Sequence, residues 1–115
     1  MRKIKLDEVL DTYDASYSLM SDGLSDNHVC LSRREVKGTI RVEGGNRALH
    51  EEIVSQTKRL GRLLDVREKD CFLMQAHTNG LAILDIWWGG AMRIHAKNRA
   101  DLKAQLETSG EYALV

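Results

Sequence analysis

The four histidines are the side chains of this chain best suited to proton transfer or metal binding. They are His28, His50, His77 and His95. His77 and His95 fall on strand-like segments either side of a middle strand, but neither has a cysteine or carboxylate at matching ligand spacing. We therefore expect these histidines at the surface, and the sequence predicts no metal ion and no cofactor.

A nuclease of the His-Asn-His type is one chemistry that the histidines suggest. His28 follows Asp26-Asn27 and precedes Asn46 and His50, an order that superficially fits a base followed by metal ligands on a helix. The spacing from Asn46 to His50 is tight for that geometry, and Gly44-Gly45-Asn46 is better explained as a helix start. A small metal-dependent hydrolase or nuclease is accordingly the third hypothesis, and the residues favour a non-enzymatic role.

Basic residues in the middle of the chain suggest contact with nucleic acid. They are Lys58, Arg59, Arg62 and Arg67. Acidic residues interleave with them, and 17 Lys and Arg balance 17 Asp and Glu overall, so the electrostatic contribution to such binding would be small. Weak nucleic-acid binding through these residues is the second hypothesis.

Apolar periodicity predicts the helices and strands that position these residues. Residues 5–20 and 47–64 carry apolar stripes of helical spacing, and residues 98–107 begin with Asn98 and Asp101, which resemble a capping box. Short strands are expected at 28–32 and 36–43, and residues 71–97 contain three strand-like runs separated by Asn79-Gly80 and Gly89-Gly90. The expected class is α+β, with helices packed on an antiparallel sheet of about five strands in the order α-β-β-α-β-β-β-α. In element order alone the chain resembles roadblock-type and profilin-like modules, which would imply the same architecture.

The predicted register of residues 71–97 follows from two-residue turns at Asn79-Gly80 and Gly89-Gly90. It pairs Met74 with Asp85 and Trp87 with Met92, and it sorts the side chains onto two faces. The first face is apolar except for Asp85 and is expected to form the core. Because a carboxylate there would cost several kcal/mol unless it is paired or protonated, Asp85 requires an explanation.

The second face of this predicted sheet is apolar along its middle strand and polar at its margins, which is typical of an interface. Its predicted contact residues are Leu84, Ile86, Trp88, Arg93 and His95. The first hypothesis is therefore a non-enzymatic protein-interaction or adaptor module that forms a homodimer, or docks on another protein, through the face formed by residues 71–97. The open alternative is that a helix covers this face.

Composition places the chain among small globular proteins. Its 115 residues predict a single domain, 1–115, and no run approaches the 18 apolar residues of a membrane-spanning helix. The N-terminal segment lacks the apolar core of a signal peptide. Cys30 and Cys71 show no metal-binding or redox spacing and are expected to be reduced. Together these features predict a cytoplasmic location without membrane contact.

Overall fold

A computed structural model of the chain describes residues 2–22, 28–32, 41–44, 47–66, 71–77, 82–88 and 91–115. Within these ranges the helices are α1 (Leu6–Asp22), α2 (His50–Leu63), which follows a 3₁₀ turn, η1 (Arg47–Leu49), and α3 (Arg99–Thr108). The strands are β1 (Arg2–Ile4), β2 (His28–Ser32), β3 (Arg41–Gly44), β4 (Cys71–His77), β5 (Ala82–Trp88), β6 (Ala91–Ala96) and β7 (Tyr112–Leu114).

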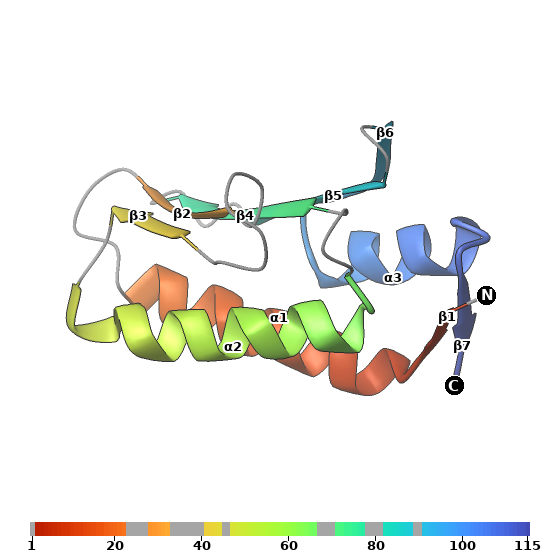
Figure 1. Cartoon of the computed structure of the whole chain (residues 1–115), viewed down its shortest axis with the longest axis horizontal. Helices are drawn as coiled ribbons and strands as arrows, with labels where there is room; N and C mark the ends of the chain where they lie inside the picture. The colour runs from red at the N-terminus through yellow and green to blue at the C-terminus, as the bar shows by residue number, and fades with distance from the viewer. Residues whose placement is uncertain are drawn as a thin grey trace.

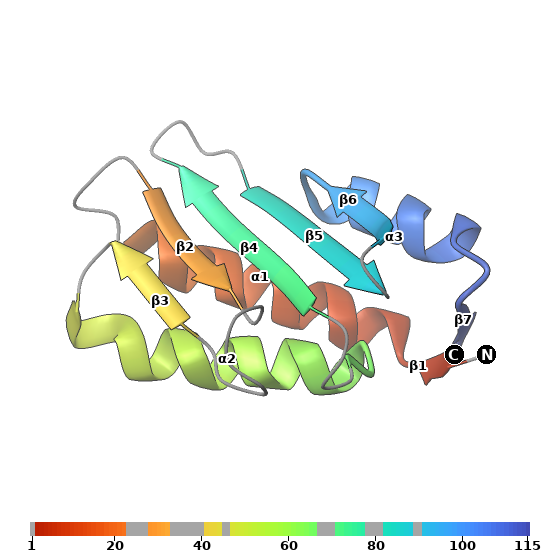
Figure 2. The same cartoon turned by 45° about the horizontal axis from the view of Figure 1, so that its top comes forward.

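The larger sheet is antiparallel throughout, and its strands follow the order β3-β2-β4-β5-β6 (Figure 2). The helices α1, α2 and α3 all lie on one side of it, so the described chain forms two layers (Figure 1). The predicted α+β class with helices packed on an antiparallel sheet is confirmed. The predicted element order omitted β1 and β7, which form a separate parallel pair.

Apolar periodicity located α1 and α2 well because each buries one stripe against the sheet. In α1 the buried stripe includes Val9, Tyr13 and Met20, and the helix ends at Asp22, two residues beyond its predicted end. In α2 the Thr57 hydroxyl lies in the apolar stripe and donates a 2.7 Å hydrogen bond to the carbonyl of Ile53, which makes its complete burial tolerable. Asn46, the predicted cap of this helix, lies outside the described residues.

The N-terminus of α3 confirms the predicted capping residues with one difference. The Asn98 side chain accepts a 2.8 Å hydrogen bond from the backbone N–H of Asp101, as an N-cap should. The Asp101 carboxylate accepts a 2.9 Å hydrogen bond from the backbone N–H of Lys97, one residue before the position used in a standard capping box. Two backbone donors are therefore satisfied where the chain turns from β6 into α3.

The parallel pairing of β1 with β7 fixes the two ends of the chain side by side (Figure 1). The backbone N–H of Val115 donates to the carbonyl of Ile4 at 2.9 Å. The Tyr112 hydroxyl, inside the core, donates a 3.1 Å hydrogen bond to the carbonyl of Leu64 at the end of α2. Because such short strands carry little periodicity, neither β1 nor β7 was predicted from the sequence.

The predicted register between β4 and β5 was wrong by one residue. Met74 pairs with Leu84 rather than Asp85, and Ala76 pairs with Ala82 rather than Ile83. Since neighbouring side chains of a strand point to opposite faces, this shift exchanges the two faces of β5. Leu84 and Ile86 therefore lie in the core, both completely buried, against the side of the sheet that the helices cover.

The register between β5 and β6 agrees with the prediction at one end only. Trp88 pairs with Ala91 and Trp87 with Met92, as predicted, but a β-bulge then shifts the remaining pairs. Ile86 pairs with Ile94, so Arg93 is the extra residue of the bulge. The bulge restores Ile94 and Ala96 to the core face, where both are buried.

Candidate functional site

The face of the sheet that points away from the helices is the first candidate site. We call it the open face, and in β4 and β5 it is formed by Cys71, Leu73, Gln75, Ile83, Asp85 and Trp87. All six are half-buried, whereas Phe72 and Met74, which point to the helices, are almost completely buried. The open face thus carries apolar side chains that no described helix covers (Figure 1).

Trp87 and Met92 form an apolar pair on the open face. The two residues are cross-strand partners on β5 and β6. Met92 is 50% exposed, and the large apolar side chains exposed in the described residues are Met92 and Val115. A half-buried tryptophan beside an exposed methionine provides a large and deformable contact surface, as protein interfaces often do.

Asp85 lies on the open face and is paired with His95. The two residues are cross-strand partners, and Nδ1 of His95 contacts a carboxylate oxygen of Asp85. The Asp85 side chain is 13% exposed and that of His95 is 45% exposed. The pairing explains how a carboxylate is accommodated between Ile83 and Trp87, because its partner stabilises the charge that burial would penalise.

The Asp85–His95 pair has a limited chemical repertoire in its present setting. Nδ1 of His95 faces the Asp85 carboxylate, so Nε2 is the ring nitrogen available to a further hydrogen-bond partner. Within the described part of the chain, no group of three histidine, cysteine, aspartate or glutamate residues could hold a metal ion. What the geometry provides is a polar contact pair within an apolar face.

The structure separates the predicted contact residues of the sheet. Leu84 and Ile86 are core residues and cannot contact a partner, which corrects their assignment to the interface. Arg93 and His95 are exposed on β6. The side chain of Trp88 lies outside the described residues. Ile83, Trp87 and Met92, which the sequence assigned to the core face, belong to the open face.

The residues predicted to contact nucleic acid lie on α2. Lys58, Arg59 and Arg62 are exposed, and Arg67 lies outside the described residues. Arg59 also connects the two helices, since its Nε donates a 3.4 Å hydrogen bond to the hydroxyl of Thr12 on α1. These residues belong to the helix layer, which lies on the side of the sheet opposite the open face (Figure 1).

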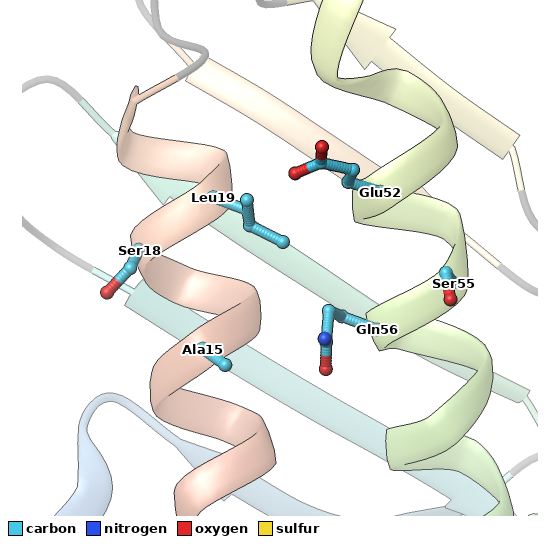
Figure 3. A pocket seen from close by; sticks show the side chains of 6 residues that line it. All are labelled: Ala15, Ser18, Leu19, Glu52, Ser55 and Gln56. Atoms are coloured by element: carbon cyan, nitrogen blue, oxygen red, sulfur yellow. The ribbon is translucent and has the colours of Figure 1, made fainter.

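A groove of about 480 Å³ runs between α1 and α2 on the surface of the helix layer. Leu19 and Gln56 extend into it from opposite helices, with Glu52 at one end (Figure 3). Its other lining residues are Ala15, Ser18 and Ser55. These short side chains form a shallow surface, and no acid, base and nucleophile converge in the groove.

The remaining histidines are distributed over the fold. His28 and His77 are cross-strand partners in β2 and β4. His50 begins α2 and lines a second depression of about 370 Å³ with Val42, Glu51 and Val54. Asp26 and Asn27, which the nuclease hypothesis requires, lie outside the described residues.

Comparison with known proteins finds no matching family model, no matching curated protein and no matching solved structure. Of the helices in the described ranges, none has the length and apolar character needed to span a membrane. The functional argument therefore depends on the geometry of the open face.

Proposed function

We propose that this protein is a non-enzymatic interaction module that self-associates, or docks on a larger protein, through the open face. The observation that carries the proposal is the placement of α1, α2 and α3 on one side of the sheet, which leaves Leu73, Ile83, Trp87 and Met92 on the other. Burying such a surface against a partner would remove apolar area from water.

The charge distribution of the open face also supports association. In the described part of β4 and β5, Asp85 is the acidic residue of the open face, and its partner is His95. An unpaired carboxylate would oppose burial under a partner, whereas a carboxylate that already has a cationic or hydrogen-bonding neighbour opposes it less. Arg93 and His95 would lie at the polar rim of such an interface.

The size of the open face sets the expected strength of self-association. Strands β4 and β5 have seven residues each, which corresponds to a length of about 23 Å, and five strands span about 24 Å. Two such faces in contact would bury on the order of 1,000 Å², at the lower limit for a specific interface. We therefore propose a weak homodimer or a transient complex rather than an obligate one.

Sedimentation velocity over a concentration series tests this proposal. The exposed Met92 is changed to glutamate, which places a charge on the open face without altering the core, and Lys103→Ala on α3 is the matched surface control. We expect the wild type and the control to increase in mass with concentration and Met92→Glu to remain monomeric. A wild type that remains monomeric at all concentrations, or equal association by Met92→Glu, would contradict self-association through this face.

A second candidate function is weak nucleic-acid binding through α2. The observation that favours it is the exposure of Lys58, Arg59 and Arg62 within one helical turn. Such binding must weaken steeply as salt increases, because it depends on the release of counterions from phosphates. Binding that is absent, or insensitive to salt and to Arg62→Ala, would exclude it. No comparable observation supports a hydrolase or nuclease.

We also propose that the module acts in the cytoplasm. The support is the sequence pattern of Cys30 and Cys71, which has no spacing typical of a secreted disulfide framework. Titration of both thiols in the native and the denatured protein tests this. Two reactive thiols after denaturation are expected, and fewer than two would contradict the proposal.

A further inference from the structure

Strand β6 is an edge of the larger sheet. The strand order places β5 on one side of β6, and no other described strand pairs with its opposite side. Edge strands leave a row of backbone N–H and C=O groups to which another strand can add. Beyond the bulge at Arg93, the segment from Ile94 to Ala96 offers such a row.

This edge carries basic side chains at alternate positions. Arg93, His95 and Lys97 are exposed, while the intervening Ile94 and Ala96 are buried in the core. His95 is paired with Asp85, whereas the side chains of Arg93 and Lys97 have no ion-pair partner among the described residues. The Trp87–Met92 pair lies beside them and adds an apolar surface.

We infer that β6 accepts an extended segment of a partner protein that carries aspartate or glutamate at alternate positions. Strand addition would satisfy the outer backbone groups of β6, and the acidic side chains would meet Arg93, His95 and Lys97 across the new strand pair. An apolar residue of the same segment would contact Met92. This binding mode uses the backbone edge of β6, and it shares Met92, Arg93 and His95 with the proposed association surface.

A second copy of β6 does not fit this edge. Antiparallel pairing of two β6 strands centred on Ile94 or His95 places Ile94 opposite Ile94 or Ala96, which keeps the core sides aligned beyond the bulge. These two registers place Arg93 opposite His95 or Lys97 respectively. Basic side chains directly opposite each other destabilise a strand pair, so the complementary partner is an acidic strand. The zero net charge of the chain likewise gives a nucleic acid no general attraction.

The inference is tested with a labelled nine-residue peptide that alternates glutamate and valine. A peptide alternating lysine and valine is its control, and fluorescence anisotropy measures the binding of each. We expect the glutamate peptide to bind at least about fivefold more tightly, because each charge reversal replaces attraction by repulsion. Hydrogen exchange of the complex should show new protection at backbone amides of β6.

The double variant Arg93→Glu/Lys97→Glu should reverse this preference, and Lys103→Glu on α3 should leave it unchanged. Both variants alter exposed side chains, and Arg93→Gln/Lys97→Gln provides a neutral version that should bind the two peptides equally. Equal binding of the two peptides by the wild type, no binding of the glutamate peptide, or tighter binding of single-stranded DNA would overturn the inference. Sedimentation of the same samples reports self-association separately.

Discussion

The register of β5 can be tested by comparing Leu84→Ala with its neighbour Ile83→Ala. Leu84 is completely buried on the helix-covered side, and Ile83 is half-buried on the open face. Removing a large side chain from a packed core loses its transfer free energy and leaves a cavity. We therefore expect Leu84→Ala to lower the free energy of unfolding by about 3 kcal/mol. Ile83→Ala should lower it by about 1 kcal/mol, since part of its surface already contacts water.

Urea denaturation followed by tryptophan fluorescence measures both variants. With an m-value of about 1.3 kcal/mol/M, the midpoint should fall by about 2.3 M for Leu84→Ala and by about 0.8 M for Ile83→Ala. If Leu84→Ala proves too unstable, Ile86→Val against Ile83→Val gives the same comparison with a smaller change, about 1 kcal/mol for the buried residue. A greater loss at Ile83 than at the buried neighbours would refute the register and, with it, the assignment of the open face.

Further predictions concern α3 and the helix-covered core. Asn98→Ala should lower the free energy of unfolding by about 1 kcal/mol, because the backbone N–H of Asp101 loses its acceptor. An unchanged urea midpoint would show that this cap is dispensable. The buried Tyr13 hydroxyl has no hydrogen-bond partner within the described structure. Tyr13→Phe should therefore stabilise the protein at pH 7 by about 1 kcal/mol. A loss of stability in this variant would show that the hydroxyl does have a partner. Burial, together with Asp14 and other nearby groups, raises the pKa of Tyr13 from 10.0 to about 12. The folded state therefore retains this proton longer than the unfolded state, and stability should fall as pH rises through 10 towards 12, by about 1.4 kcal/mol at pH 11. Denaturation at pH 8 and pH 11 should show this component in the wild type and not in Tyr13→Phe, and identical losses in both would contradict it.

The parts of the fold that the sequence predicted are those with strong periodicity. α1, α2 and α3 were expected within three residues of their observed ends, because each has an apolar stripe or a capping residue. β2 was predicted at its observed bounds. Strands β1 and β7 were missed, since three-residue strands have too few side chains to display a pattern.

The open face was misassigned because register depends on one unknown turn. The prediction assumed a two-residue loop at Asn79-Gly80, which placed Asp85 in the core. The same assumption decided which side chains of β5 were predicted to face the core and which to face away from it. Asp85 itself was the available signal, since moving β5 by one residue takes this carboxylate out of the core and puts Leu84 and Ile86 into it. The bulge at Arg93 and the pairing of Asp85 with His95 depend on β6 and could not be read from β5 alone.

The central claim is that the open face is an association surface, and methyl NMR across a concentration series tests it most directly. Leu73 and Ile83 report on the open face, and Leu19, in the groove between α1 and α2, is the control on the opposite layer. We expect the Leu73 and Ile83 methyl resonances to shift with concentration while those of Leu19 remain fixed. Stationary Leu73 and Ile83 resonances, or shifts confined to Leu19, would contradict the claim.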